Sequence, residues 1–254
     1  MMFSNLNSKI NSLDSIGLEE LDTVSLLNRV DSKYVVPFFQ LDFIFQCLKS
    51  NYSILEIDGK RVSTYENNYF ETPEFLFYKD HHNGYVNRIK VRSRRFVETN
   101  RCFFEIKQKM HIERTSKYRE EIPEILTSIN EERKQKIQEH TRKKISDVNL
   151  IFKNNFKRIT LVDKFFTERI TIDTNLTYIK NEQELYFGDL AIIEIKQSKR
   201  NSTSALKAFL KENQIRERKI SKYIYGVLML DPNIKKNQFL PTIKKINKLN
   251  LITK

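Results

Sequence analysis

The chain has 254 residues, of which 39% are hydrophobic and 30% are charged, a balance typical of a globular protein rather than a disordered one. Its net charge of +13 favours an anionic partner, such as nucleic acid, an acidic membrane surface or a phosphate-rich small molecule. Cys47 and Cys102 are the only cysteines, which excludes a disulfide framework and a cysteine-based zinc site, so a reducing cytosol fits best.

Targeting and phosphate-loop motifs are missing from the sequence. The N-terminus has no basic stretch followed by an apolar run, so we do not expect a secretory signal. No stretch reaches the roughly 20 apolar residues of a membrane helix. Neither a Walker-type phosphate loop nor a dinucleotide-binding glycine motif occurs. Any binding of phosphate would therefore rely on side-chain cations.

Apolar spacing predicts the elements of the first part of the chain. We expect helices at 18–27, 39–48 and 73–80, and strands at 31–37, 52–57 and 61–69. Asp58 and Gly59 predict a hairpin turn between the last two strands. Thr72 can cap the helix that begins at Pro73, because proline suits the first helical turn.

The stretch 86–109 reads as two strands with a short connection. Successive side chains of a strand point to opposite faces, so alternate residues share a face. The charged residues of this stretch alternate in that way: Arg88, Lys90, Arg92, Arg94, Glu105, Lys107 and Lys109. Ile89, Val91, Phe104 and Ile106 occupy the other face, where they can pack under helices. Cations placed so close repel one another, which favours a polyanion bound among them.

The rest of the chain alternates strands and helices in the same manner. We expect a strand at 116–121, a helix opened by Pro123, and a charged helix over 130–145 with Ile137 as its apolar anchor. Strands 150–159 and 164–173 are predicted to pair, and strands 175–180 and 190–197 to form a second pair. Helices are expected at 202–212 and 221–230, followed by a basic, weakly patterned tail.

These elements predict an α+β fold in a single domain, residues 1–232 with its N-terminal helix, followed by a tail at 233–254. Many antiparallel strands with helices outside suggest a closed β-barrel, because closure removes free edges. A solvated strand face is the ordinary explanation of such alternation. That explanation weakens because the pattern recurs with the same residue types, in Lys117 and Arg119, Arg169 to Asp173, and Glu194 and Lys196. We therefore expect Arg169 and the other cations to point into a polar tunnel.

A series of motifs resembles the VTC domain of polyphosphate polymerases, within the triphosphate tunnel metalloenzyme, or CYTH-like, superfamily. The series runs in order from residue 29 to residue 226: RVDSKY, YFETPEFLFYKDHHNGYVNRIKVRSRRF, FFEIKQK, SKYR, FKR with RITID, IIEIKQS and KISKYIYG. Each motif alone is weak, but the ordered series is specific. Glu71 stands where the family block usually has aspartate, which affects local packing more than chemistry.

The resemblance implies a tunnel that holds ATP, triphosphate and polyphosphate. Catalytic cations would be Arg88, Lys90, Arg92, Lys107 and Lys196. Phosphate-binding residues would be Lys33, Lys117, Arg119, Arg158, Arg169, Lys219 and Lys222. Glu194 would hold a divalent metal, Mn²⁺ or Mg²⁺, and Glu105 would either lie near the metal or pair with cations.

Three functions compete at this point. The leading one is an ATP-dependent polyphosphate polymerase, and the second is a tunnel triphosphatase acting on inorganic, nucleoside or organic triphosphates. Nucleic-acid binding, suggested by the charge, is third, since the sequence has no aromatic RNA-binding signature or recognition helix. Other features have plainer explanations: adjacent His81 and His82 face apart, residues 133–144 fit a solvated helix face, and residues 244–254 fit a frayed basic terminus.

Overall fold

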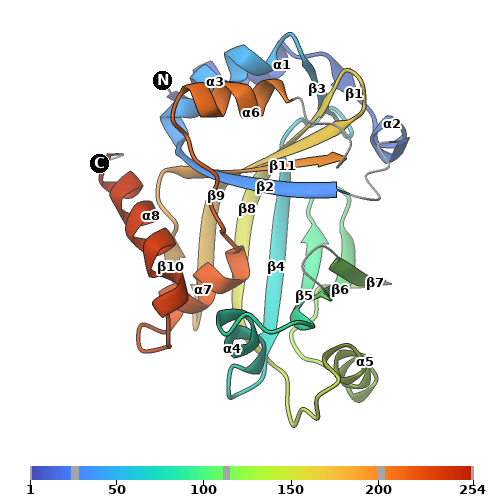
Figure 1. The fold of residues 1–254 in the computed structure, drawn as a ribbon. Helices are drawn as coiled ribbons and strands as arrows, with labels where there is room; N and C mark the ends of the chain where they lie inside the picture. The colour runs from blue at the N-terminus through green and yellow to red at the C-terminus, as the bar shows by residue number, and fades with distance from the viewer. Residues whose placement is uncertain (1, 24–28, 111–114, 199–203, 253–254) are drawn as a thin grey trace.

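In the computed structural model, residues 2–23, 29–110, 115–198 and 204–252 are described. The fold is α+β: one large, almost entirely antiparallel sheet with helices packed around it (Figure 1). The strands are β1 (Ser15–Ile16), β2 (Arg29–Pro37), β3 (Tyr52–Leu55), β4 (Ser63–Glu71), β5 (Arg88–Phe96), β6 (Arg101–Lys109), β7 (Thr115–Ile122), β8 (Asn149–Asp163), β9 (Glu168–Lys180), β10 (Gln183–Tyr186) and β11 (Leu190–Ser198). The helices are α1 (Met2–Asn11), α2 (Leu18–Thr23), α3 (Leu41–Leu48), α4 (Leu76–His82), α5 (Glu131–Thr141), α6 (Ala205–Glu212), α7 (Lys222–Leu230) and α8 (Leu240–Ile252), with 3₁₀ turns η1 (Phe38–Gln40) and η2 (Asn237–Phe239).

The sheet is curved but open, so the expectation of a closed barrel is wrong. The strand order is β2-β11-β9-β8-β4-β5-β6-β7, and among the described residues the end strands β2 and β7 do not pair with each other. In Figure 1, β2 and β11 run across one end of the long strands. The free edge of β2 is occupied instead by the segment before α7, where the Arg218 amide donates to the Lys33 carbonyl at 2.7 Å. This segment satisfies part of the edge that closure would otherwise have paired.

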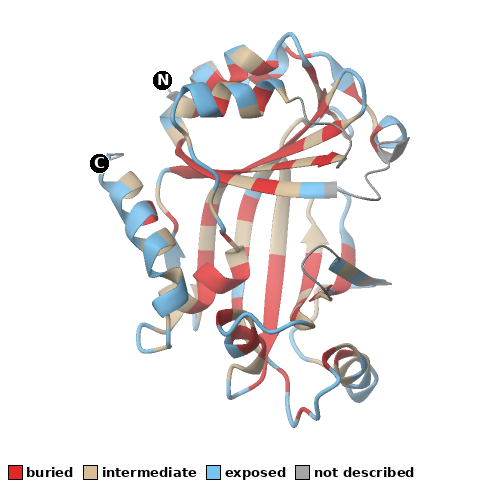
Figure 2. Ribbon diagram, in the orientation of Figure 1, coloured by how far each residue is buried: buried red, intermediate tan, exposed pale blue. Residues whose placement is uncertain are grey.

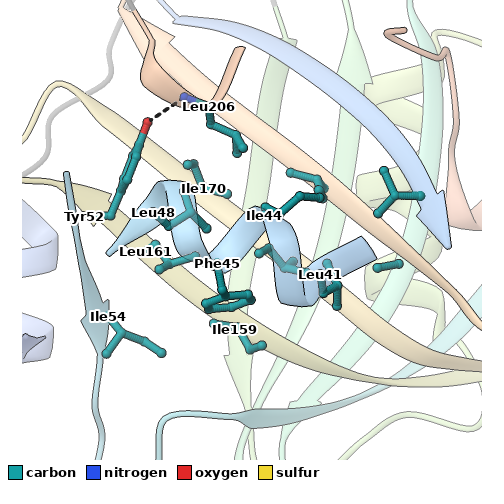
Figure 3. Close-up of a cluster of buried hydrophobic side chains, with 14 of the residues drawn as sticks. Leu41, Ile44, Phe45, Leu48, Tyr52, Ile54, Ile159, Leu161, Ile170 and Leu206 are labelled. Carbon is teal, nitrogen blue, oxygen red and sulfur yellow. Dashed lines mark hydrogen bonds between the residues drawn. The ribbon is translucent and has the colours of Figure 1, made fainter. Parts of the chain in front are cut away.

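Helices cover one apolar face of the sheet at the β2–β11 end. Helices α1, α3 and α6 pack there against Ile159, Leu161, Ile170, Ile172 and Ile193, all of which are nearly inaccessible to solvent. Figure 3 shows α3 lying across this face, with Leu41, Ile44, Phe45 and Leu48 directed into the cluster. Figure 2 shows that the central strands are mostly buried or intermediate, while the outer sides of α6 and α8 are exposed.

A second apolar cluster confirms the predicted orientation of the strands in 86–109. Ile89, Val91 and Phe104 are at most 1% exposed and pack with Ile137 of α5 in this cluster. Their neighbours along each strand, including Lys90 and Lys107, line a cavity on the opposite face. The sheet therefore has apolar residues under its helices and charged residues on its concave side.

Several predicted elements require correction. Asp58 and Gly59 do form a tight turn with positive φ, which is closed by the pairing of Ile57 with Lys60. The flanking strands do not pair with each other, because β3 pairs with β8, and β4 pairs with β5 and β8. The predicted hairpin is therefore limited to the turn itself. The segment 175–180 pairs with β8 and β10, whereas β11 pairs with the first half of β9 and with β2. The predicted helix 18–27 is α2, and its last four residues lie outside the described part.

The helix predicted at Pro123 does not form. The Ser93 hydroxyl accepts from the Leu126 amide at 3.0 Å, and Asn68 donates to the Leu126 carbonyl at 2.8 Å. These bonds from β5 and β4 hold the segment as an irregular connection, and the helix begins only at Glu131, where Asn130 caps it. The predicted tail is also more ordered than expected, because it contains α8, with Ile246 buried against the body of the protein.

Candidate functional site

The concave face of the sheet encloses a cavity of about 340 Å³, called here the inner cavity. Among the described residues, the cationic side chains that line it are Lys33, Lys90, Arg92, Arg94, Lys107, Lys117, Arg158, Arg169, Lys196 and Lys222. Only two carboxylates, Glu105 and Glu194, line it within the same described part of the chain. Strands from both halves of the sheet and the start of α7 contribute to this lining, so residues distant in sequence meet here.

The register of the strands places like charges directly opposite one another. Lys90 lies opposite Lys107, which lies opposite Lys117, so three lysines form a row across β5, β6 and β7. Like charges in directly opposed positions destabilise a sheet. In the next row, Arg92 lies opposite Glu105, which lies opposite Arg119. The lysine row is therefore a cost to the free protein that a bound polyanion would offset.

Glu105 is the centre of an ion cluster on the wall of the inner cavity. Its carboxylate accepts from Arg92 Nε at 2.7 Å and lies 2.5 Å from Lys117 Nζ and 3.5 Å from Arg119 Nε. Burial alone would raise the pKa of Glu105, but Arg92, Arg94 and Lys117 hold it well below its ordinary value. These contacts favour the pairing role for Glu105 over the role of metal ligand.

Asp173 forms a second ion cluster that the sequence analysis did not assign to the site. Its side chain is 1% exposed and accepts two bonds from Arg158, Nε to Oδ1 at 2.6 Å and Nη2 to Oδ2 at 2.7 Å. Lys222 of α7 donates to the same carboxylate. Burial favours the neutral acid, but Arg158 and Lys222 offset this and hold the pKa of Asp173 below its ordinary range. Asp173 thus fixes both cations at the edge of the inner cavity.

Glu194 lines the inner cavity in a different environment. Lys196 Nζ lies 3.5 Å from its carboxylate, and Glu194 stands opposite Lys33 in the register of β11 and β2. Burial would raise the pKa of Glu194, but Lys196, Lys33, Arg158 and Lys107 hold it well below the usual value. The side chain therefore remains ionised among cations, where it can contribute a carboxylate oxygen to a ligand.

The two predicted metal ligands fit a metal to different degrees. Among the described residues, no group of three or more His, Cys, Asp or Glu side chains is placed to hold an ion. Mg²⁺ commonly binds through one or two carboxylates together with substrate phosphates and water. Glu194 fits that arrangement, because it faces the cavity and is free of the tight multiple pairing that engages Glu105.

A larger cavity of about 620 Å³, called here the outer cavity, continues from the inner one. Lys33, Lys90 and Lys107 line both cavities, so the two spaces share one wall. Arg88 and Lys219, which sequence analysis assigned to the site, line the outer cavity only. Apart from Arg119, the predicted cations therefore lie along the two adjoining cavities rather than around a single point.

Arg119 departs from the prediction, and other residues were missed. Arg119 lines neither cavity, because its guanidinium lies over the Phe103 ring at 3.6 Å from the centroid. Arg94 and Tyr69 line the inner cavity although neither was assigned to the site. The alternation in β5 could have identified Arg94, which continues the spacing of Arg92, whereas no local signal identifies Tyr69.

The charged helix α5 has the solvated face that the sequence predicted, whereas the two adjacent histidines do not simply face apart. On α5, Lys134 pairs with Glu131, Lys136 pairs with Glu139, and Arg133 donates to Glu120, as expected of a solvated helix face. His81 and His82, by contrast, both line the outer cavity.

Among the described helices, none has both the length and the apolar character needed to span a membrane.

Glu71 explains how α4 and α7 are held at the site. Its fully buried carboxylate accepts from the amides of Thr72, Phe77 and Tyr78 and from the Tyr223 hydroxyl. Burial raises the pKa of Glu71 to about 7 despite these hydrogen bonds. The carboxylate therefore caps α4 and ties it to α7. This role is structural, in agreement with the expectation that Glu71 affects packing.

Binding of inorganic triphosphate is expected to take up protons at pH 8. Burial and Lys107 hold the pKa of Lys90 well below its ordinary value, and burial lowers the pKa of Lys222 to about 8. A bound anion favours the charged form and raises both pKa values, so protons are absorbed. Calorimetry in two buffers of different ionisation enthalpy measures the number taken up. Lys90→Met should reduce the uptake and Lys244→Met, an exposed change on α8, should not; equal enthalpies in both buffers for the wild type would contradict the expectation.

Comparison with known proteins places this site in context. The family model described as the VTC domain matches residues 28–231, and no curated protein matched the chain. A candidate adenylate cyclase from Bacillus halodurans is 13% identical, with a TM-score of 0.48 over 77% of this chain and 96% of that one. A candidate adenylyl cyclase from Hippeastrum that has a dominant triphosphatase activity is 13% identical, with a TM-score of 0.43 over 78% of this chain and 94% of that one. The Pct1 RNA triphosphatase of S. pombe is 8% identical, with a TM-score of 0.32 over 89% and 87%.

Proposed function

This chain belongs to the VTC domain family, and on that premise we propose that it is a metal-dependent polyphosphate polymerase. In this proposal the protein transfers the terminal phosphoryl group of ATP onto a growing polyphosphate chain. The observation that carries the proposal is the continuous run of cations through the inner and outer cavities. A lining of this length suits a chain of phosphates better than it suits one small anion.

The cations would act by positioning the phosphates and by neutralising charge. Phosphoryl transfer spreads negative charge over the equatorial oxygens, and catalysis consists mainly of orientation and electrostatic stabilisation. Arg92 and Arg158 are each fixed by a carboxylate, which holds their guanidinium groups in place before the substrate arrives. Lys90, which donates to Ser221 Oγ at 2.9 Å, and Lys107 lie between the two cavities and would contact the phosphates nearest to the reacting bond.

The attacking group in this proposal is the end of the polyphosphate chain, so the protein needs no nucleophile of its own. Glu194 would hold a divalent ion, Mn²⁺ or Mg²⁺, together with phosphate oxygens of the substrate. Such an ion supplies charge neutralisation and orients the transferred group. The cations turn into a cavity instead of forming an exposed stripe, which favours a linear phosphate chain over nucleic acid as the ligand.

Incubation of the purified protein with ATP and Mn²⁺ tests this function. The expected products are ADP and a polymer long enough to be seen on a gel with a polyphosphate-binding dye. A phosphate-specific exopolyphosphatase should remove the stained polymer, which distinguishes it from nucleic acid.

Hydrolysis is the second candidate, because the inner cavity alone has cations enough for one triphosphate. In that case water takes the place of the chain end as the attacking group. Consumption of ATP or triphosphate with release of monomeric phosphate only would reject the polymerase and support a tunnel triphosphatase.

A further inference from the structure

The arginines of the inner cavity are held in different ways. Arg92 and Arg158 each donate to a buried carboxylate, that of Glu105 and that of Asp173 respectively. Arg94 lines the same cavity and is 8% exposed, yet it forms no ion pair with a carboxylate among the described residues. Its two Nη groups make no hydrogen bond within that part of the chain either. A buried cation without a counter-charge is costly, so its presence here needs an explanation.

A relay of two amides holds Arg94 in place of a carboxylate. Arg94 Nε donates to Asn67 Oδ1 at 2.7 Å, and Asn67 Nδ2 donates to Asn154 Oδ1 at 2.9 Å. The three residues lie directly opposite one another in the register of β5, β4 and β8, and both asparagines are 0% exposed. Because a guanidinium can only donate, Asn67 must present its oxygen to Arg94, and this fixes the orientation of both amides. The relay therefore orients the guanidinium without adding negative charge.

An aromatic ring supports the same guanidinium, again without a counter-charge. Arg94 lies over the Tyr65 ring at 5.0 Å from its centroid, and Arg158 lies over the same ring at 4.8 Å. The Tyr65 ring is stacked on Phe156, with 5.2 Å between the two centroids. Such contacts attract a cation but leave it charged. Arg94 is thus fixed from two sides by neutral groups.

The place of Arg94 along β5 suits the binding of a chain. Arg88 lines only the outer cavity, Lys90 lines both cavities, and Arg92 and Arg94 line only the inner one. Arg94 lies four residues from Lys90, about 13 Å along a strand, so the two cations would meet different parts of a bound polyanion. Burial and Arg92 lower the pKa of Arg94 below its ordinary value, and Glu105 offsets them only in part. A bound anion would favour the charged form and reverse this penalty.

We propose that Arg94 binds a phosphate group of the substrate through its Nη groups, and that Asn67 and Asn154 are positioning residues that orient it without neutralising it. This inference rests on the proposed function and adds one phosphate-binding cation and its two supports to the inner cavity. A carboxylate in place of Asn67 would hold the guanidinium equally well, but it would compete with phosphate for the charge. The neutral relay thus favours affinity for a polyanion over stability of the empty protein.

Asn67→Asp tests the relay directly. Aspartate has the same shape and can still accept from Arg94, and Asn154 can turn its amide to donate to the second oxygen, because its Nδ2 has no hydrogen-bond partner among the described residues. Calorimetric titration should show inorganic triphosphate bound about 10- to 150-fold more weakly, as expected for loss of a charge-assisted hydrogen bond. The melting temperature should not fall below that of the wild type, since a buried cation gains a counter-charge. A purely structural role would not separate these two measurements.

Variants of Arg94 and a matched control complete the experiment. Arg94→Met removes the charge and should weaken triphosphate binding over the same range. Arg94→Lys retains the charge and should recover part of that loss. Asn155→Asp is the control, because it adds the same negative charge one residue after Asn154 on the opposite face of β8. Its affinity for triphosphate should remain close to that of the wild type.

The outcomes separate this inference from the function on which it depends. Wild-type affinity in a folded Asn67→Asp or Arg94→Met protein would overturn the inference alone. Equal weakening in Asn155→Asp would also overturn it, because any added negative charge would then have the same effect. If Asn67→Asp does not fold, the comparison of Arg94→Met with Arg94→Lys decides, and equal affinities in those two would count against the inference. Failure of the wild type to bind triphosphate would reject the proposed function together with it.

Discussion

Replacement of Asp173 by asparagine is expected to lower the free energy of unfolding by about 3–5 kcal/mol, because it leaves two buried cations without their counter-charge. Arg158 and Lys222 both bind this carboxylate, and both side chains are largely buried. Removal of one partner from a buried ion pair costs more than the net value of the pair, since the remaining charge stays desolvated. Denaturant unfolding of the two proteins at neutral pH measures the difference.

The pH dependence of the free energy of unfolding is an independent test of the Asp173 cluster. Arg158 and Lys222 depress the pKa of Asp173 in the folded protein below its value of about 3.9 in an unfolded chain. The contribution of Asp173 to stability is therefore complete above that value and is lost as the pH falls through the folded-state pKa. Asp173→Asn should make the acid unfolding curve shallower in this window.

Glu121→Gln is the matched control for Asp173→Asn. Glu121 pairs with Arg101 on neighbouring strands of the same sheet, but both side chains are more than half exposed. Water screens such a pair, and its loss should change stability little. The addition of Arg158→Met to Asp173→Asn should recover part of the loss, because an apolar side chain does not need a counter-charge. A fully stable Asp173→Asn protein would show that the two cations are solvated after all.

Glu194→Gln is expected to abolish metal-dependent activity, roughly 100-fold or more, while the fold remains intact. Glutamine has nearly the same shape, and within the part of the chain that the structure describes the carboxylate forms one ion pair, with Lys196 at 3.5 Å. Of the two carboxylates that line the inner cavity in the described part of the chain, the change removes the one that is free to share an ion with phosphate oxygens. Product formation with Mn²⁺ and Mn²⁺ binding in the presence of triphosphate should both decrease.

The control for Glu194→Gln is Glu184→Gln, an equivalent change at an exposed position of β10. Thermal melting of both variants separates loss of folding from loss of metal. Wild-type activity and Mn²⁺ binding in Glu194→Gln would place the metal on other residues, with Glu105 the next to be tested.

Much of the local structure could be predicted because it follows from spacing along the chain. The alternation of Ile89 and Val91 with Lys90 and Arg92 identified both the strand and its cavity face, and β5 has that orientation. Helix α7 was predicted closely, over 221–230, and the structure shows that Ser221 is its N-cap rather than its first helical residue. The segment after Pro123 was not, since proline at a first turn permits a helix but does not oppose hydrogen bonds from distant strands.

The partner of each charge could not be predicted, because it depends on register, curvature and the path of connections between elements. Asp173 was assigned to the right face of its strand, yet only the tertiary structure brings Lys222 to it from α7. The same holds for Tyr223, which reaches Glu71 across 152 positions of sequence.

The sequence by itself determined which side chains share a face, since a strand turns alternate residues to opposite sides wherever it lies in the fold. It therefore determined that the concave surface would be cationic and that Glu194 would lie among cations. Only the tertiary structure decided that the sheet stays open at β2, that Arg119 turns onto Phe103, and that η2 builds a wall of the outer cavity. Those outcomes depend on which segments compete for the same edge or surface, and that competition is settled by packing between residues far apart in the chain.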